Sequence, residues 1–345
     1  MADESPIHDD EDVVLFPSIA VSTPTNPTLL NISVHGWIFE PQYTSIRRNL
    51  LLSTFCRSLK LLDAECDTEL FKQRTRYFLV DNERGKRVPF SVTNTRNISE
   101  PSGTEGHFRG SVQIPLSSSE ASSVAPLTIT VSTGARRFHG EVFMIKPGGI
   151  TVISDIDDTI KISEVTDLNK LLRNTFLRPF APTPGIIPLY RNFYNHGALF
   201  HYISATPWQL YPPLAEFFRE SGLPNGTFHL KEFRWKDSRF FDLLLAPQKF
   251  KTDLILSRLA LAPQRRFILV GDSGEQDPEI YGEIARRNPQ CDIRILIREL
   301  DAHPLTTSRR ERAFAFVPDH VWRVVSEGDL GLASATETLT RFAIE

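Results

Sequence analysis

The sequence is poor in cysteine, and its apolar runs are short. The three cysteines, Cys56, Cys66 and Cys291, show no metal-ligand spacing and leave one thiol without a pairing partner. We therefore expect reduced, mostly buried thiols of a cytoplasmic protein. No apolar run approaches the roughly 20 residues of a membrane span, and the acidic start at residues 1–4 is no signal peptide. These absences predict a soluble protein without a transmembrane segment, in which any contact with a membrane is peripheral.

A large excess of charge of either sign is also absent. The 39 lysines and arginines nearly balance the 42 aspartates and glutamates, which gives a net charge of -3. No nucleic acid is therefore expected as a partner bound through bulk electrostatics. The hydrophobic fraction of 41% and the charged fraction of 23% are values of a globular protein. A chain of 345 residues suffices for two domains. We expect an acidic, frayed tail over residues 1–12, a first domain over 13–147 and a second over 148–345.

The first domain has the pattern of a mostly-β fold. Turn signals separate runs rich in β-branched and aromatic residues, which we expect as strands at 13–16, 31–39, 76–80, 88–92, 107–114, 127–131 and 140–145. This spacing predicts hairpins and a sandwich-like sheet or open barrel. One amphipathic helix is expected near residues 45–62. Arg74, Arg76 and Tyr77 are expected on a hairpin surface or in its core, because no catalytic constellation is visible here.

After a breaker cluster at residues 146–149, the pattern changes to alternating strands and helices. Apolar strands are expected at 151–154, 199–204, 267–271 and 293–297. Helices are expected between and after them at 166–176, 186–196, 210–221, 252–261 and 278–287. This alternation predicts an α/β fold with a parallel sheet that helices cover on both faces. A last strand near 321–325 and a closing helix from about residue 332 complete the prediction.

The first of these strands runs directly into carboxylates. Asp155, Asp157 and Asp158 follow the apolar run 150–153, and Thr159 comes next. In open α/β sheets, ligands bind at the carboxyl ends of the strands. Carboxylates this close repel one another unless a bound cation or a shared proton compensates them. The alternative for this stretch alone is an Asp-rich turn that caps the following helix.

Two later strand ends supply partners for these carboxylates. The second strand ends with the hydroxyls of Ser204 and Thr206, which can donate to a phosphate oxygen, although such a sequence is also an ordinary helix start. The third ends in a second acidic cluster that includes Asp272 and Asp277. Lys251 opens the helix that leads into this third strand. Carboxylates of this kind suit Mg²⁺, and a carboxylate can also act as a nucleophile towards phosphorus, so the set predicts phosphoryl chemistry.

These residues resemble the motifs of the haloacid dehalogenase-like phosphatases. The family pattern is an apolar strand with Asp-x-Asp-x-Thr, a strand that ends in Ser or Thr, a lysine, and Gly-Asp with a further acid, and all four parts occur here in order. More narrowly, residues 149–300 resemble the catalytic domain of the actin-patch-associated phosphatidate phosphatase family. The resemblance implies a Rossmann-like catalytic domain of haloacid dehalogenase type over 148–345, with Mg²⁺ as cofactor.

The resemblance also implies a role for each residue of the first motif. Asp155 is expected to be the nucleophile that forms an aspartyl phosphate. Asp157 is expected to be the acid/base, with its main-chain carbonyl on Mg²⁺, and Thr159 is expected to orient the loop. Asp158 and Glu275 are expected in solvated loops, with a direct role as the alternative.

The other motifs are expected to hold the substrate and the metal. Ser204 would bind the phosphoryl group, with Thr206 and Trp208 beside it as substrate-binding residues. Lys251, preferred to Lys249 because of its place in the helix, would neutralise the nucleophile and the phosphate. The metal ligands implied are Asp155, Asp157, Asp272 and Asp277.

The leaving group is not fixed by these motifs. The family resemblance implies phosphatidate, hydrolysed to diacylglycerol and phosphate at a membrane surface. A phosphatase for a soluble or protein-borne phosphomonoester is the first alternative, and a non-catalytic binding module on a phosphatase scaffold is the second. The segment 228–235 mixes aromatic and basic residues, which predicts a half-buried hairpin, with lipid contact as the alternative. The basic cluster at 309–312 is expected on a solvated face, with attraction to anionic lipid as the alternative.

Overall fold

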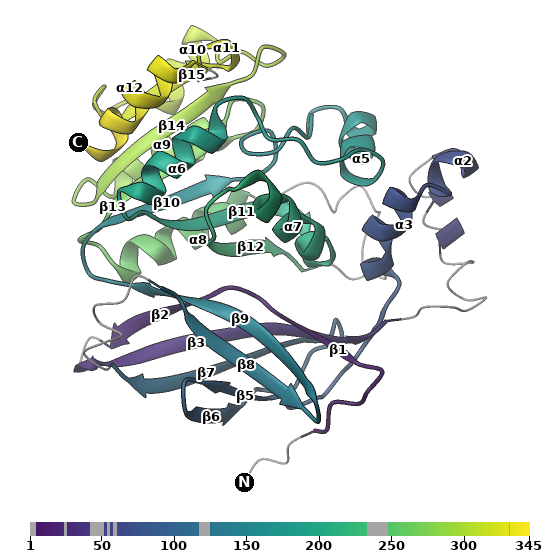
Figure 1. Cartoon of the computed structure of the whole chain (residues 1–345). Helices are drawn as coiled ribbons and strands as arrows, with labels where there is room; N and C mark the ends of the chain where they lie inside the picture. Colours follow the sequence, from purple (N-terminus) through teal and green to yellow (C-terminus); the bar gives the residue numbers. More distant parts are fainter. Residues whose placement is uncertain are drawn as a thin grey trace. The chain divides into compact units, whose positions relative to one another are not determined.

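The computed structural model describes residues 5–23, 26–41, 52, 53, 56, 57, 61–116, 125–232, 248–330 and 332–345. The chain forms two compact units, one made mainly of the chain before residue 147 and the other mainly of the chain after it, together with Asp63–Arg74. Each unit contains one large sheet (Figure 1). Within the described ranges, no helix has both the length and the apolar character needed to cross a membrane.

The sheet of the first unit has nine strands and is mostly antiparallel. Its order is β1-β3-β2-β9-β8-β5-β6, and β4 and β7 both pair with β3; only β2 and β9 pair in parallel. The strands are β1 (Asp12–Leu15), β2 (Ser18–Thr23), β3 (Asn26–Glu40), β4 (Asp81–Asn82), β5 (Pro89–Val92), β6 (Thr95–Ile98), β7 (His107–Pro115), β8 (Leu127–Thr133) and β9 (Arg136–Ile145). Their alternating apolar residues form one buried cluster. The expected β-rich fold is therefore present, with all nine strands in one hydrogen-bonded sheet, and a packing of two separate sheets stays a prediction.

Two expectations for this half of the chain need correction, and a third falls mostly outside the described residues. The strand expected at 76–80 is a 3-10 helix, η1 (Arg76–Phe78), that follows α2 (Asp63–Cys66) and α3 (Glu69–Thr75). Phe71, Thr75 and Leu79 are all buried, and their spacing of four residues is helical. The tail is not frayed throughout, because Ile7 packs in the core and Glu11 is buried against Lys86. The helix expected near 45–62 lies almost entirely outside the described residues.

The cysteines are not all reduced thiols. Cys56 and Cys66 are disulfide-bonded, whereas Cys291 is a free, half-buried thiol. The expectation of reduced thiols is therefore wrong for the first two. An even or odd number of cysteines cannot reveal such a bond, because pairing depends on whether the two Cβ atoms approach each other in the fold.

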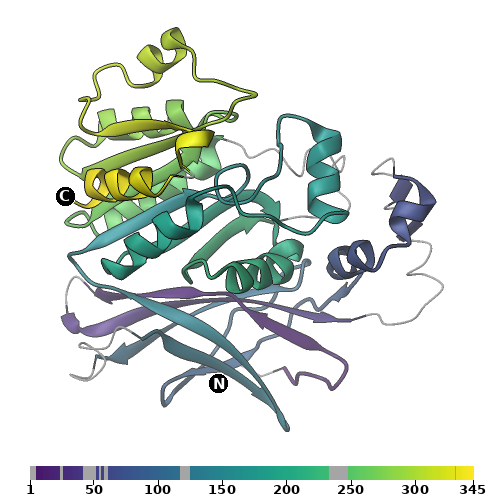
Figure 2. The ribbon, with the colours of Figure 1, turned by 45° about the horizontal axis from the view of Figure 1, so that its top comes forward.

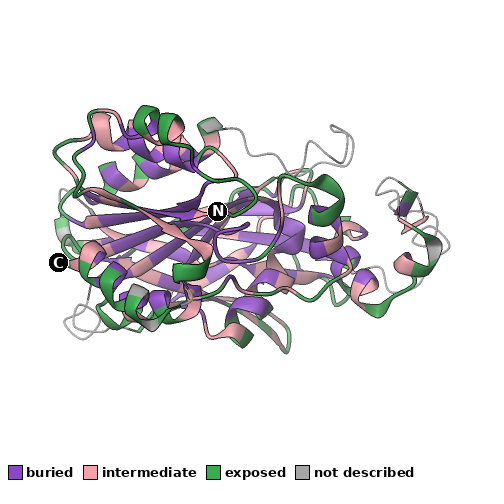
Figure 3. Cartoon of the chain, turned by 90° about the horizontal axis from the view of Figure 1, so that it is seen from above, coloured by how far each residue is buried: buried purple, intermediate pink, exposed green. Residues whose placement is uncertain are grey.

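The sheet of the second unit is parallel throughout and has six strands in the order β12-β11-β10-β13-β14-β15. The strands are β10 (Ile150–Asp155), β11 (Leu199–Pro207), β12 (Thr227–Lys231), β13 (Arg266–Asp272), β14 (Asp292–Glu299) and β15 (Trp322–Ser326). The four central strands are buried along most of their length (Figure 3). Such continuous burial explains why their sequences read as unbroken apolar runs. The parallel sheet expected from the sequence is therefore present.

Helices cover both faces of this sheet. Successive residues of a strand point to opposite sides, so one strand contributes apolar side chains to both layers of helices. Phe200 and Tyr202 of β11 pack against Tyr190 and Phe218, on one face. Ile203 lies on the other face, in a core that includes residues of α8 and α9. The helices are α5 (Leu168–Phe176), α6 (Ile186–Asn195), α7 (Tyr211–Ser221), α8 (Gln248–Leu261), α9 (Asp277–Arg287), α10 (Thr307–Ala313), α11 (Glu327–Leu330) and α12 (Ala333–Ile344), with the 3-10 turn η2 (Trp208–Leu210).

Two local arrangements were not expected from the sequence. Residues 227–231 form the edge strand β12 and not one arm of a hairpin, because they pair in parallel with β11. The residues beyond 232 in the expected hairpin lie outside the described part of the chain. The short helices α2 and α3 lie beside α5 (Figures 1 and 2), where Glu65 pairs with Arg173 and Arg74 Nη1 donates to the Thr175 carbonyl at 3.0 Å.

Candidate active site

The carboxyl ends of neighbouring parallel strands bring the acidic residues together. Asp155 is the last residue of β10, and Asp272 is the last residue of β13, which pairs with it. Asp277 begins α9, five residues further along the chain. The three side chains are buried, and each offers a carboxylate oxygen within 4.8 Å of the others. Strand order thus joins residues that are more than 110 positions apart in the sequence.

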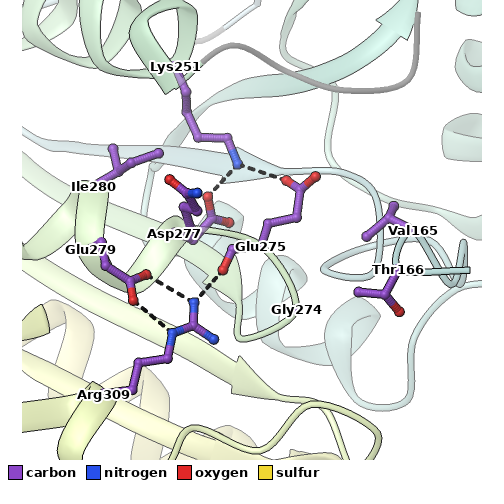
Figure 4. Close-up of a pocket in the computed structure, with 10 residues that line it drawn as sticks. Val165, Thr166, Lys251, Gly274, Glu275, Asp277, Glu279, Ile280 and Arg309 are labelled. Atoms are coloured by element: carbon purple, nitrogen blue, oxygen red, sulfur yellow. Dashed lines mark hydrogen bonds and ion pairs between the residues drawn. The ribbon is translucent and has the colours of Figure 1, made fainter. Parts of the chain in front are cut away.

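Lys251 lies at the centre of this acidic cluster. Its Nζ atom is 3.0 Å from Asp155 Oδ1 and 3.6 Å from Glu275, and it contacts Asp277 Oδ1. Figure 4 shows the ammonium group between Glu275 and Asp277. The side chain of Lys251 is 3% exposed. Lys249, the alternative considered from the sequence, is exposed and lies outside the cluster.

The cluster holds more negative than positive charge, and this sets its protonation. Burial raises the pKa of Asp155 well above its usual value, and Asp277 and Glu275 add to the effect, while Lys251 opposes it. Burial and the same two neighbours also raise the pKa of Asp272. For Lys251, burial opposes the charged form, but Asp155 and Asp277 outweigh it and raise the pKa of the ammonium group. A second cation would therefore be stabilised here.

One atom in particular suits such a cation. Asp155 Oδ2 is buried and has no hydrogen-bond partner among the described residues, a situation that is costly unless a ligand completes it. Asp272 and Asp277 supply further carboxylate oxygens beside it. Mg²⁺ binds oxygen ligands and commonly uses one or two carboxylates. The residues present therefore fit the cofactor that the sequence resemblance implies.

Asp157 faces a different set of partners. Its Oδ1 accepts from Ser163 Oγ at 2.7 Å and lies 2.8 Å from Lys161 Nζ. Its Oδ2 accepts from Ser204 Oγ at 2.5 Å and from Thr206 Oγ1 at 3.2 Å. Burial opposes ionisation, but Lys161, with the hydroxyl donors, outweighs it and holds the pKa of Asp157 at about 2. The carboxylate is thus ionised and fixed by four donors.

Lys161 and Ser163 were not singled out from the sequence. Lys161 lies between Ile160 and Ile162, in a run that looks like ordinary alternation after the acidic motif. Its side chain is 2% exposed, and a buried ammonium group requires an anionic partner. The spacing of four residues between Asp157 and Lys161 is the one sequence feature that relates them, and it does not indicate that Lys161 is buried.

The remaining expected residues divide between contacts with the site and packing. Thr159 Oγ1 donates to Asp272 Oδ2 at 3.3 Å, so it links the first acidic motif to the second. Ser204 and Thr206 meet Asp157, as described above. Trp208 is buried, with its ring 6.1 Å from that of Tyr211, and it is not among the residues that line the cavity beside Lys251.

That cavity has a volume of about 750 Å³ and opens beside the acidic cluster. Its lining includes Lys251, Glu275 and Asp277 on one side and Glu279 and Arg309 on another (Figure 4). Arg309 forms a two-point ion pair with Glu279 and donates to the carbonyls of Ser273 and Glu275. The expectation of a solvated position is therefore wrong for Arg309, because its guanidinium supports the loop that carries the second acidic motif. Glu275, in the same loop, is half-buried and lines the cavity near Lys251.

Asp158 has a structural position and not a solvated one. Its side chain is buried, and its two oxygens accept from the backbone N–H groups of Ser163 (2.8 Å), Glu164 (2.7 Å) and Val165 (2.7 Å). Its backbone has a φ of 55°, which Asp and Asn tolerate better than most residues. Asp158 thus closes the loop that follows the first motif.

We expect Asp158→Asn to destabilise the protein without removing its chemistry. The amide nitrogen cannot accept a hydrogen bond, so at least one buried N–H group loses its partner, at a cost of about 1–3 kcal/mol in the free energy of unfolding. Urea denaturation measures this change. Asp253→Asn, on the exposed side of α8, is the matched control and should change stability by less than about 0.5 kcal/mol. Unchanged stability together with lost activity would instead assign Asp158 a direct role.

The fold and the site together define a parallel α/β domain with an acidic, lysine-containing centre at its strand ends. Residues 150–299 match the family model described as "Phosphatidate phosphatase APP1, catalytic domain". This match confirms, over those residues, the resemblance expected from the sequence.

Two curated relatives match the same part of the chain. One is Phosphatidate phosphatase APP1 of Saccharomyces cerevisiae, with 33% identity over 158 residues, which cover 45% of this chain and 26% of the yeast protein. The other is an uncharacterized protein of Schizosaccharomyces pombe, with 31% identity over 169 residues, 48% of this chain and 27% of the relative. The matched regions thus span about a quarter of the length of these relatives.

Among solved structures, a phosphoserine phosphatase in its apo form aligns with 47% of this chain and 90% of its own. The sequence identity is 10% and the TM-score is 0.29. A likeness at this TM-score does not establish a shared fold.

Proposed function

We propose that residues 148–345 form a Mg²⁺-dependent phosphatase domain of haloacid dehalogenase type, which hydrolyses a phosphomonoester through an aspartyl-phosphate intermediate. The substrate proposed is phosphatidate, which would be cleaved to diacylglycerol and phosphate. The proposal rests on one observation above all. Lys251 bridges Asp155 and Asp277 while Asp155 Oδ2 has no partner among the described residues. Similarity of residues 150–299 to a phosphatidate phosphatase catalytic domain supports it.

The first step would be the attack of Asp155 on the phosphorus atom. One of its carboxylate oxygens would form the new bond to phosphorus as the bond to the leaving oxygen breaks. Ser204 would turn its hydroxyl from Asp157 Oδ2 to donate to the transferring phosphoryl group, and Lys251 would offset charge on Asp155 and on the phosphoryl oxygens. Asp155, Asp272 and the main-chain carbonyl of Asp157 would hold Mg²⁺, which would supply further positive charge to the same oxygens. Asp277 would hold Lys251 and act as the second acid of the metal site.

Asp157 would serve both steps as the acid/base. In the first step Asp157 would be protonated and would give its proton to the departing alkoxide. The ionised form, which the structure favours, then takes a proton from water as that water attacks phosphorus. The bond between phosphorus and Asp155 breaks in this second step, which releases phosphate and restores the carboxylate.

The leaving group and the place of action belong to the proposal as well. A phosphatidate substrate would require a peripheral encounter with a membrane surface from the cytoplasm. The lining of the cavity of about 750 Å³ includes Lys251, whose ammonium group lies 3.0 Å from Asp155 Oδ1. Its lining is more acidic than basic, which a phosphate ester tolerates only where Lys251 and a metal neutralise it.

Phosphate release from phosphatidate in mixed micelles tests the proposal. We expect release with Mg²⁺ and at least about a 100-fold loss when a chelator removes the metal. A soluble phosphomonoester, assayed in parallel, separates the two substrate classes. Release from the soluble ester alone would keep the mechanism and remove phosphatidate as the substrate. No metal-dependent release from either ester would leave a non-catalytic binding module.

A further inference from the structure

Lys161 occupies a place in the site that the proposed roles leave unexplained. Its ammonium group is as buried as that of Lys251, and it lies 2.8 Å from Asp157 Oδ1. Ser163 Oγ also contacts both Lys161 Nζ and Asp157 Oδ1. Among the described residues, Asp155 is thus paired with the buried Lys251, and Asp157 is paired with the buried Lys161.

The local backbone explains how Lys161 returns to Asp157. The N–H groups of Ile160 and Lys161 both donate to the carbonyl of Ile156, each at 2.9 Å, and Asp158 N–H donates to the Lys161 carbonyl at 2.7 Å. These bonds fold residues 156–161 into a tight turn, in which the backbones of Asp157 and Lys161 form an isolated β-bridge. The approach of the two side chains therefore follows from the turn itself.

A second pairing places an aromatic ring beside the lysine. Ile162 N–H donates to the Ala181 carbonyl and Thr183 N–H donates to the Ile160 carbonyl, at 2.9 and 2.8 Å. The Phe180 ring, next to this pairing, has its centroid 4.9 Å from Lys161 Nζ. An ammonium group within about 6 Å of a ring centroid is attracted by the ring, most strongly when it is shielded from water.

Phe180 is itself fixed by a residue from a distant part of the sequence. The guanidinium carbon of Arg74, at the end of α3, lies 3.3 Å from the Phe180 ring centroid. Arg74 is buried and donates to the Thr175 carbonyl on α5. Among the described residues before 147, Asp63–Arg74 is the segment that belongs to the second compact unit. Its last residue, Arg74, contacts the Phe180 ring, and that ring contacts Lys161.

These contacts fix the direction of the Asp157 carboxylate. Lys161 and Ser163 bind Oδ1, so Oδ2 is left to meet Ser204 and Thr206 at the end of β11. Ser204 is where the phosphoryl group is proposed to bind. A buried ion pair of this kind adds little net stability, and its expected contribution is geometric.

We propose that Lys161 is a positioning residue for the acid/base Asp157, and that Phe180, held by Arg74, sets where the Lys161 ammonium group lies. This inference rests on the proposed phosphatase function. The polar contacts of the Lys161 ammonium group are with Asp157 and Ser163, so its proposed effect on the reaction passes through Asp157. Its loss should therefore harm the proton transfer to the leaving group and leave the nucleophile in place.

The test compares two soluble esters that differ in how much they need that proton. An alkyl phosphate, such as dihexanoyl phosphatidate, has a poor leaving group, whereas p-nitrophenyl phosphate has a good one. The ratio kcat/KM reports the steps up to formation of the aspartyl phosphate. We expect Lys161→Met to lower kcat/KM about 100-fold for the alkyl ester and less than about 5-fold for the aryl ester. Lys170→Met, an exposed lysine on α5, is the matched control and should change neither value.

Equal losses for both esters would overturn the inference, because a damaged fold or weaker phosphate binding affects them alike. Unchanged kinetics would overturn it too. Phe180→Leu keeps the lysine and serves if Lys161→Met does not fold; we expect a loss of about 10-fold for the alkyl ester alone. An equal loss for both esters, or none, in this variant would count against the inference in the same way. If the unaltered protein hydrolyses neither ester, the proposed function fails, whereas an active protein without the selective loss refutes Lys161 alone.

Discussion

Asp155→Asn is expected to abolish phosphate release, with a fall in kcat of more than about 10³-fold. The amide is a poor nucleophile towards phosphorus, and the substitution removes the atom, Oδ2, that has no partner among the described residues. The fold should persist, because the amide fills the same space and its oxygen can still accept from Lys251, which lies 3.0 Å from Asp155 Oδ1. Phosphate release under saturating substrate and Mg²⁺ measures the loss.

Two further measurements make this prediction specific. Thermal unfolding should show a folded Asp155→Asn protein, and the variant should form no acid-stable, hydroxylamine-sensitive phosphoprotein when mixed with substrate. Asp253→Asn, on the exposed side of α8, should keep full activity. Substantial turnover by Asp155→Asn would remove Asp155 from the role of nucleophile.

Lys251→Met should lose both activity and stability. The lysine is buried between Asp155 and Asp277, so its removal leaves two buried carboxylates without their counter-charge. Breaking a buried ion pair on one side costs about 3–5 kcal/mol. We expect a loss of that size in the free energy of unfolding, measured with urea in the absence of metal, and a fall in kcat of at least about 100-fold.

The neighbouring lysine provides the control. Lys249→Met changes an exposed residue of the same helix two positions away, so stability should change by less than about 0.5 kcal/mol and activity should remain. Equal effects of the two substitutions would show that the lysine assignment is wrong. A stable but inactive Lys251→Met protein would instead mean that the carboxylates are protonated or hydrated once the lysine is gone.

The parallel sheet could be predicted because its strands are buried on both faces and carry unbroken apolar runs. The strands and helices after residue 150 lie within a few residues of their expected positions for this reason. The first half of the chain was less predictable. Residues 76–78 have strand-forming side chains, but Phe71, Thr75 and Leu79 are buried at a helical spacing, and tertiary packing outweighs local propensity there. The edge strand β12 was taken for a hairpin arm because parallel pairing leaves no local turn signal.

The site residues that lie in short acidic motifs at strand ends could be predicted from the sequence. The charged residues that join the site only through packing in the fold could not. Asp155, Asp272 and Asp277 follow strands, and the geometry of parallel sheets brings such ends to one edge. Lys161 was missed because one lysine between two isoleucines gives no sign that it is buried. Arg309 looked like part of a basic surface, and only its contacts with Glu279 and the backbone of the second acidic motif distinguish it. Burial of a charged side chain is a property of the fold and has no local pattern.

The strand order of the parallel sheet has a consequence for the synthesis of the chain. β10 pairs with β11 on one side and with β13 on the other, yet β13 leaves the ribosome more than 100 residues after β10. One edge of β10 therefore stays open while the residues between β10 and β13 are translated, and long-range parallel pairing of this kind is slow and exposes apolar edges to aggregation. A nascent chain that stops before residue 277 would carry Asp155 without Asp277, the second carboxylate that Lys251 bridges. Premature termination anywhere between β10 and residue 277 should thus yield an inert product that depends on chaperones for its solubility.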